Sequence, residues 1–453
     1  MTRTVIDGAY VATVDGEGTE LASGYVVIRD ARIEAVGAGR APSEVIDGAR
    51  EVIPGEGLLV TPGLVNTHHH LYQWLTRGYA QDSILFDWLV SLYPAWSRID
   101  ADLVGDGALG AMAVLARSGC STVGDHHYVF PQGGGDIVGS IVDAAQTLGV
   151  RLHATRGSMD LGASDGGLPP DFAVETTAAA LEASAAAVHR YDDPSFDSMV
   201  RVAIAPCSPF SVTADLLRES AALARDLGVR LHTHGAETVE EEAFCRERFG
   251  MSPTDYLESV GWIGDDVWMA HCVHLSAGDI ARFAASGTGV AHCPSSNARL
   301  AAGIAPVRDM LRAGVPVGLG VDGAASNESG QLGTEVRAAV LAARLRDGAD
   351  ALSGRDALRV ATMGGARVLG RQDEIGSVEP GKLADLALWR VDGVEHAGIA
   401  DPVAALALGA MPPLARLIVQ GETVVDDGEL TRADSGDVAR RVARASAALA
   451  ERL

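Results

Sequence analysis

Short apolar runs alternate with segments of helical period through the middle of the chain. Between residues 58 and 370, stretches such as AALARDLG and PVRDMLRAG separate eight β-rich runs. The runs are GLLVTPGLVNTH, CSTVGDH, VRLHATR, VRVAIAPC, VRLHTH, VWMAH, TGVAHC and VPVGLGVD. Eight strand-then-helix units in about 310 residues predict an α/β fold built on a (β/α)8 barrel. A doubly wound open sheet is the rival, but it does not explain polar residues at nearly every strand end.

The two ends of the chain have a different texture. Residues 1–57 alternate short β-rich pieces with Gly and Asp turns, and similar pieces return in residues 371–453. Neither end alone can bury much apolar surface. We therefore expect both ends to meet in one small β-sandwich domain, which includes the amphipathic helix predicted at the C-terminus, with the barrel occupying residues 58–370.

Composition limits the partners of this protein. Asp and Glu number 60 against 36 Lys and Arg, which gives a formal charge of -24 and argues against a nucleic-acid partner. The five cysteines are scattered without a CxxC pair, as is typical of reduced thiols inside a cell. No apolar run is long enough for a signal peptide or a bilayer span. We expect a soluble, cytoplasmic homo-oligomer without a membrane partner.

Several predicted strands end in residues that can bind a metal ion. In a barrel, such groups meet at the carboxyl ends of the strands. The first run ends in three consecutive histidines, and strand alternation places the first and third on one face. Imidazoles and a carboxylate suit zinc or a similar divalent cation, with a position left for water. The candidates are His68, His70, His234, Glu237, His271 and Asp322.

The distribution of lysine bears on the number of metal ions. Barrel hydrolases with two metal ions can bridge them through a modified lysine on a strand in the middle of the barrel. The only lysine of this chain is Lys382, beyond the predicted barrel. We therefore expect one divalent metal ion per subunit, zinc in the first place and iron as the alternative.

The segments PGLVNTHHH, LHTHGAET, MAHCVH and GLGVDGAASN together resemble the amidohydrolase superfamily, in its branch of aminohydrolases and chlorohydrolases acting on purines, pterins and triazines. The resemblance implies metal ligands at His68, His70, His234 and Asp322. It also implies acid/base roles for Glu237 and His271, with Asp322 taking a proton from the attacking water.

A narrower resemblance, to bacterial 8-oxoguanine deaminases, is carried by HHHLYQWLTR, DHHYVFP, TRGSMDLGASDGGLPPD and HCPSSNARLAAGI. It implies attack of metal-activated water at C2 of 8-oxoguanine, giving uric acid and ammonia. One departure is Gly235, where the branch commonly has a bulkier apolar residue, and we expect it to widen the pocket beside Glu237. Two alternatives stay open: a related enzyme acting on pterin, guanine-like or s-triazine rings, and a catalytically inactive barrel scaffold.

Residues near the strand ends are candidates for holding a purine-like substrate. The amide of Gln73 offers a donor and an acceptor to a ring amide edge. Arg156 is a candidate for meeting an anionic or carbonyl edge. Aromatic rings provide stacking faces. The remaining candidates are Tyr72, Trp74 and Trp96 for stacking, and His126 after the second run.

Overall fold

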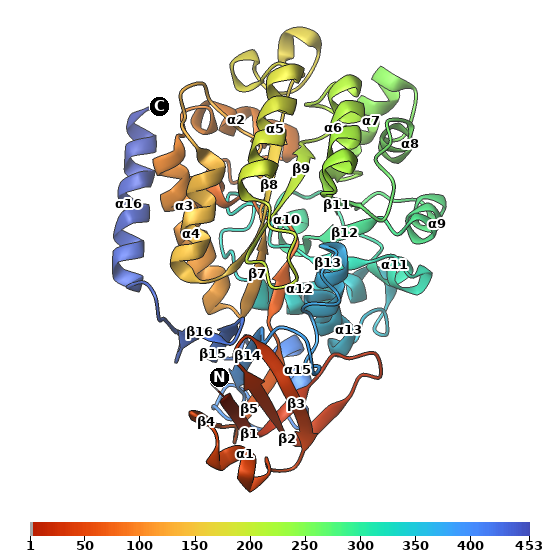
Figure 1. Cartoon of the computed structure of the whole chain (residues 1–453). Helices are drawn as coiled ribbons and strands as arrows, with labels where there is room; N and C mark the ends of the chain where they lie inside the picture. Colours follow the sequence, from red (N-terminus) through yellow and green to blue (C-terminus); the bar gives the residue numbers. More distant parts are fainter. Residues whose placement is uncertain (1–2) are drawn as a thin grey trace.

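The structure is a computed structural model that describes residues 3–453. Its centre is a closed barrel of eight parallel strands in chain order, and a separate sheet lies at one end (Figure 1). The barrel strands are β6 (Leu64–Asn66), β7 (Cys120–Gly124), β8 (Arg151–Ser158), β9 (Val200–Pro206), β10 (Leu231–Gly235), β11 (Val267–His271), β12 (Gly289–His292) and β13 (Val317–Leu319). Each of the eight predicted runs overlaps one of them. The last strand pairs with the first, so the rival open sheet is excluded.

Helices surround the barrel, and most of them cover the outer faces of its strands. They are α2 (Leu85–Trp96), α3 (Ala101–Arg117), α4 (Ile137–Leu148), α5 (Thr177–Tyr191), α6 (Ala214–Leu227), α7 (Val239–Phe249), α8 (Pro253–Ser259), α9 (Ala277–Ser286), α10 (Pro294–Arg299), α11 (Val307–Ala313), α12 (Leu332–Asp347), α13 (Gly354–Arg359) and α14 (Gly365–Val368). Side-chain hydroxyls cap several of them, as where Thr213 accepts a hydrogen bond from Leu216 N at the start of α6. The turns at the ends of these helices direct the chain back to the next strand.

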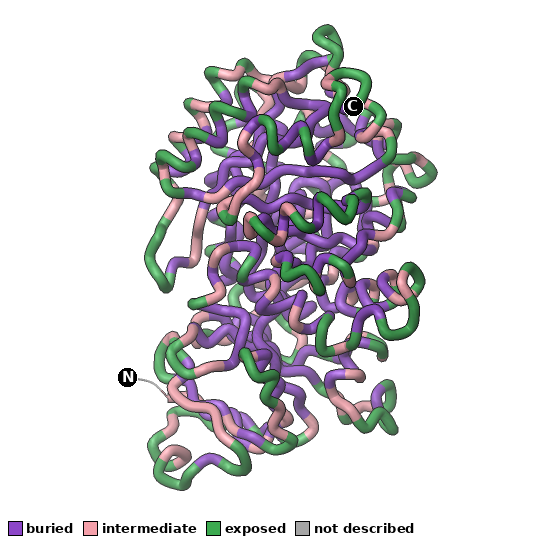
Figure 2. The backbone as a smooth tube through the Cα atoms, turned by 90° about the vertical axis from the view of Figure 1, so that its right-hand side faces the viewer, coloured by how far each residue is buried: buried purple, intermediate pink, exposed green. Residues whose placement is uncertain are grey.

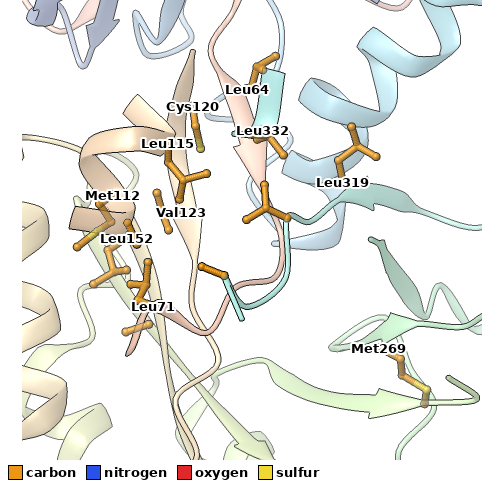
Figure 3. Packing of buried hydrophobic residues seen from close by; sticks show 14 of the residues in the cluster. Leu64, Leu71, Met112, Leu115, Cys120, Val123, Leu152, Met269, Leu319 and Leu332 are labelled. Carbon is orange, nitrogen blue, oxygen red and sulfur yellow. The ribbon is translucent and has the colours of Figure 1, made fainter. Parts of the chain in front are cut away.

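Strand side chains alternate between two apolar layers. Leu64, Val123 and Leu319 belong to the large cluster between strands and helices, part of which Figure 3 shows. Val65 and Ala291 belong to a second cluster, within the barrel. Because both faces of each strand are buried, the strands are almost continuously apolar in sequence, as expected of a parallel sheet. Figure 2 shows buried chain through the interior and exposed segments on the outer surface.

The two ends of the chain build the separate sheet. It consists of β1 (Arg3–Ala12), β2 (Glu20–Arg29), β3 (Arg32–Ala38), β4 (Glu51–Pro54), β5 (Leu58–Pro62), β14 (Leu386–Arg390), β15 (Leu414–Val419), β16 (Glu422–Asp426) and β17 (Glu429–Leu430). Antiparallel pairing of β5 with β14 joins the N-terminal strands to the C-terminal ones. Two short helices, α1 (Ser43–Asp47) and α15 (Pro402–Leu408), accompany these segments. The predicted α/β class, barrel and separate β domain are confirmed.

The start of the barrel differs from the expectation. Leu58–Pro62 forms β5 of the separate sheet, so the barrel begins with β6, not at residue 58. Between the two strands, Gly63 N donates a hydrogen bond to Asp385 O. An added Cβ at Gly63 would lie 2.4 Å from Ser121 Oγ, so only glycine fits this close approach. The apolar run is continuous across this break and therefore does not reveal it.

The C-terminal helix α16 (Ser435–Glu451) packs on the barrel and not on the separate sheet (Figure 1). Its buried residues, including Val438 and Leu449, face α3. Arg441 Nε donates to Asp106 Oδ1 at 2.7 Å across the same contact. The expected grouping of this helix with the β domain is wrong, because the apolar stripe of a helix does not specify the partner that covers it.

None of the helices within residues 3–453 combines the length and the apolar character that crossing a bilayer requires. All five cysteines are buried and unpaired. They are therefore core side chains, with Cys207 alone of them lining the cavity described below.

Candidate active site

Three imidazoles and one carboxylate converge at the mouth of the barrel. His68 and His70 follow β6, His234 lies in β10, and Asp322 follows β13. His70 Nε2 is 3.2 Å from His234 Nε2, and Asp322 Oδ1 lies 3.2 Å from His68 Nε2 and 3.3 Å from His70 Nε2. Ligand atoms bound at about 2.0–2.1 Å to one tetrahedral zinc ion lie roughly 3.3 Å apart. The four side chains therefore have the spacing of a single cation site.

Hydrogen bonds orient each imidazole toward the centre of this site. His70 Nδ1 donates to His126 O at 2.6 Å, and His234 Nδ1 donates to Cys207 O at 2.7 Å. In a neutral imidazole with a protonated Nδ1, the Nε2 atom carries a lone pair. The Nε2 atoms of both rings therefore present lone pairs to each other, an arrangement that a cation between them makes favourable.

His68 is oriented by a relay of two rings. His232 Nδ1 donates to Trp268 O at 2.9 Å, so His232 Nε2 accepts a hydrogen bond from His68 Nδ1 at 2.8 Å. His68 Nε2 then carries a lone pair and has no hydrogen-bond partner within residues 3–453. Burial lowers the pKa of His68 well below its usual value and that of His234 to about 3, which keeps both rings neutral. Neutral imidazole is the form that binds metal.

The carboxyl group of Asp322 in this site and that of Glu237 beside it differ in their protonation state. Burial raises the pKa of Glu237 to about 8, despite the nearby His271. Although burial opposes it, the charge of His271 holds the pKa of Asp322 well below its usual range. At neutral pH Glu237 is therefore protonated and can donate a proton, whereas Asp322 is ionised and can accept one. Two groups whose pKa values lie apart in this way can act as the acid and the base of a catalysed reaction.

His271 lies between the two carboxyl groups. Its Nε2 is 3.6 Å from Glu237 Oε1 and 3.8 Å from Asp322 Oδ2, and its Nδ1 donates to Asn297 Oδ1 at 2.9 Å. Ser296 Oγ donates to Asp322 Oδ2 at 2.5 Å. Asn297 was not predicted, although it lies in the HCPSSNARL segment that the resemblance singled out.

The backbone at these strand ends is strained. Ala236, His271 and Asp322 have φ values of 51°, 70° and 63°, in the left-handed region that non-glycine residues seldom adopt. Glu241 holds the first of these turns, because its carboxylate accepts hydrogen bonds from Ala236 N at 3.0 Å and Glu237 N at 2.7 Å. Glu241 was also missed, although the sequence TVEE following Glu237 has the spacing of a helix cap.

A small cavity lies beside the cation site, with about 350 Å³ of space that no atom fills, part of it open to solvent. Of the predicted substrate contacts, only Gln73 lines it, and both polar atoms of its amide lack a partner within residues 3–453. A Cβ added at Gly323 would lie 1.8 Å from Gln73 Oε1, so the glycine makes room for this amide. The lining residues that were not predicted are Leu85, Trp88, Leu89, Tyr128, Cys207, Phe210 and Leu300.

The other predicted substrate contacts lie outside the lining of this cavity. Arg156 binds Glu175 through two hydrogen bonds of 3.0 and 2.7 Å and stacks on Phe130, in a separate groove. Trp96 Nε1 donates to Thr76 Oγ1. Trp74 stacks against the guanidinium of an arginine, and Tyr72 is buried behind the cavity wall. The side chains that follow strands in sequence therefore do not all turn toward the mouth.

His126 and Gly235 have places other than those expected. The imidazole of His126 lies among those of His68, His70 and His234, and its Nε2 donates to Ala205 O at 2.9 Å. A Cβ added at Gly235 would meet Met269 and Leu257, in the outer apolar layer. The expectation that Gly235 widens the pocket is therefore wrong, because this residue faces away from the cavity.

Comparison with known proteins identifies the class. A model of the amidohydrolase family matches residues 59–424, so the chain belongs to this family. It is a hydrolase of carbon–nitrogen bonds in cyclic amidines, and its histidine-rich site binds a divalent metal.

Individual relatives cover almost the whole chain. The chain is 44% identical to 8-oxoguanine deaminase of Pseudomonas aeruginosa, over 99% of this chain and 100% of that protein. It is 37% identical to isoxanthopterin deaminase of an unknown prokaryotic organism, over 97% and 96%. The crystal structure of an atrazine chlorohydrolase of Arthrobacter aurescens in complex with zinc has a TM-score of 0.91 and 33% identity, covering 98% and 100%. The predicted resemblance to the family is confirmed.

Proposed function

We propose that this protein converts 8-oxoguanine and water to uric acid and ammonia. The observation that carries the proposal is the pair of carboxyl groups of opposite protonation, Glu237 and Asp322, facing one small cavity beside a cation site. The likeness to 8-oxoguanine deaminase over the full length supports the choice of substrate. We further propose that one zinc ion binds His68, His70, His234 and Asp322, with iron as the alternative.

The protein side chains move the protons of this reaction. A divalent cation bound at this site lowers the pKa of an adjacent water toward about 7. The oxygen of this water attacks C2 of the purine, and Asp322 accepts a proton from the water in the same step. Glu237 donates its proton to the ring nitrogen next to C2, and His271, between the two carboxyl groups, helps to transfer the proton that leaves with ammonia. One C–O bond forms and one C–N bond breaks, without any oxidation or reduction.

The walls of the cavity suit a flat heterocycle. Leu85, Leu89, Phe210 and Leu300 offer apolar surface to the ring faces. The unpaired amide of Gln73 has both a donor and an acceptor for the amide edge of the six-membered ring. A site with few polar groups at defined places selects a substrate by which of its edges those groups can pair with.

The test is a direct assay of purified protein with 8-oxoguanine, followed by uric-acid absorbance and ammonia release. Guanine, isoxanthopterin and hydroxyatrazine are assayed side by side, and metal content is measured on the same sample. We expect the highest kcat/KM for 8-oxoguanine and about one zinc or iron per chain. A higher kcat/KM for isoxanthopterin would show that isoxanthopterin, and not 8-oxoguanine, is the preferred substrate. If metal-loaded protein turned over none of the four compounds, the proposal would be contradicted.

A further inference from the structure

The cavity beside the cation site has only a narrow opening. All of its lining residues are buried, and the most exposed of them, His234, has 7% of its surface accessible. The wall thus offers no entrance of the width of a two-ring heterocycle. Part of the wall must therefore move each time such a ligand enters or leaves, as in enzymes whose substrates are enclosed by a loop or a lid.

The helix α2 is the part of the wall with the fewest attachments. Leu85, Trp88 and Leu89 line the cavity from this helix. Other lining residues come from the barrel strands, from the 3-10 helix η1 (Leu71–Thr76), which packs on α3 and α16, or from the end of α10, which packs on α12. Within residues 3–453, α2 has no comparably extensive contact with another helix or strand. Segments with few packing contacts open at the lowest cost in free energy.

The chain is weakly held at both ends of α2. Residues 77–84, before the helix, form no helix or strand, and Gly78 and Ala80 have φ values of 79° and 47°. Ile84 provides no side-chain hydrogen bond to cap the first turn of α2. Near the other end, Pro94 lies inside the helix and has no N–H to donate to the carbonyl four residues earlier. We call residues 78–96 the cover, since this segment can turn as a unit about its two ends.

Arg299 holds the cover in place. This residue ends α10, and its Nη1 donates a hydrogen bond to Gln81 O at 2.7 Å. Its Nε and Nη2 donate to Glu328 Oε1 at 3.3 and 3.2 Å. Glu328 belongs to the loop after β13, which also carries Asp322 of the cation site. The side chain of Arg299 is only 19% exposed, so water competes little for these charge-assisted hydrogen bonds.

We propose that the cover opens to admit the substrate, and that Arg299 is the positioning residue that keeps the cover closed between these events. The inference rests on the proposed function only for the size of the ligand. A closed cover excludes water from the reacting ring, whereas an open cover lets the purine in and the product out. The hydrogen bond from Arg299 to Gln81 O therefore sets how often the cavity opens.

The thiol of Cys207 reports the opening of the cover. All five cysteines are buried, and Cys207 alone of them lines the cavity. The thiol reagent N-ethylmaleimide reaches Cys207 only when the wall opens, so the rate of its modification in metal-loaded protein measures how often this happens. We expect Arg299→Met to raise this rate about tenfold, the equivalent of roughly 1.4 kcal/mol. The other four cysteines should react at their wild-type rates, as peptide mass spectrometry can measure.

Two further variants separate the cover from a general loss of stability. Arg299→Lys keeps one charged donor, so its rate of Cys207 modification should lie between those of the wild type and Arg299→Met. Arg225→Met is the matched control, because Arg225 also binds a carboxylate, that of Asp266, and a backbone carbonyl, but at the opposite end of the barrel, where β11 begins. This variant should leave the rate unchanged. No change at Cys207 in Arg299→Met, or an equal increase at all five cysteines, would overturn the inference.

Hydrogen exchange identifies the segment that moves. The amides of the cover should exchange about tenfold faster in Arg299→Met than in the wild type, with those of α3 unchanged. Faster modification of Cys207 without faster exchange in the cover would show that another part of the wall moves, and would contradict the proposal. Neither measurement needs turnover. If the wild type does not act on 8-oxoguanine, the proposed function fails, while the role of the cover is still decided.

Discussion

The two ends of the barrel use buried polar side chains in opposite ways. At the end facing the separate sheet, the side chains of Arg151 and Asp385 are fully buried and form an ion pair of 3.0 Å. Arg151 Nη1 also donates to Ser198 O, and Asp385 accepts from Gln420 N. At the mouth, by contrast, His68 Nε2 and the amide of Gln73 have no partner within residues 3–453.

The backbone at the mouth is strained as well. Left-handed φ values at Ala236, His271 and Asp322 lie at the mouth, where strands turn to present their side chains. Satisfied groups stabilise a fold, whereas unpaired groups and strained turns are retained where they bind or react. One barrel thus carries a stabilising end and a reactive end, and each prediction below affects one of them.

Removing the metal is expected to have the largest effect, and only at the mouth. Dialysis against a chelator should abolish turnover, because the lone pairs of His68, His70 and His234 then meet no cation. Adding zinc back should restore it. Activity and metal content are measured together on the same sample. Full turnover by metal-free protein would contradict the role assigned to these residues.

Glu237→Gln should lower kcat by about 10²–10⁴, because the amide cannot supply a proton to the ring. Metal content and melting temperature should stay at wild-type values, since no cation-site ligand is altered. Glu240→Gln, in the first turn of α7, is the control and should retain activity. If Glu237→Gln lost the metal but kept its turnover, Glu237 would not be the proton donor.

Asp385→Asn tests the opposite end. It leaves the charge of Arg151 buried without a counter-charge, so the free energy of unfolding should fall by about 3–5 kcal/mol. The kcat of the folded enzyme should not change. Denaturant unfolding and steady-state kinetics measure the two quantities. The double variant Arg151→Met/Asp385→Leu removes both charges and should recover most of the stability. A lower kcat of this double variant would show that the two ends of the barrel are not independent.

Trp88→Phe should have the smallest effect. Trp88 lines the cavity from α2 and donates from Nε1 to Ala325 O at 3.3 Å. Losing this hydrogen bond loosens the cover of the cavity by about 0.5–1.5 kcal/mol. We expect KM for 8-oxoguanine to rise up to about tenfold with kcat nearly constant. A fall in kcat with KM unchanged would instead place the indole among groups that act on the reacting atoms.

Much of the fold could be predicted because its signals are local. Strands buried on both faces read as apolar runs, and all eight barrel strands were recognised in this way. The boundary at Pro62–Gly63 was missed, since the apolar run continues from one sheet into the other. The position of α16 was missed because the helix that covers its apolar stripe lies more than 300 residues earlier in the chain.

The sequence by itself determined the reactive groups, because strand alternation and strand ends place His68, His70, His234 and Asp322 toward one mouth whatever the rest of the chain does. Only the tertiary structure decided the shape of the cavity. Trp88, Phe210 and Leu300 come from α2 and two distant loops, and no local pattern records that they meet. The protonation of Glu237 was likewise decided by burial, since desolvation arises only when the whole barrel closes around it.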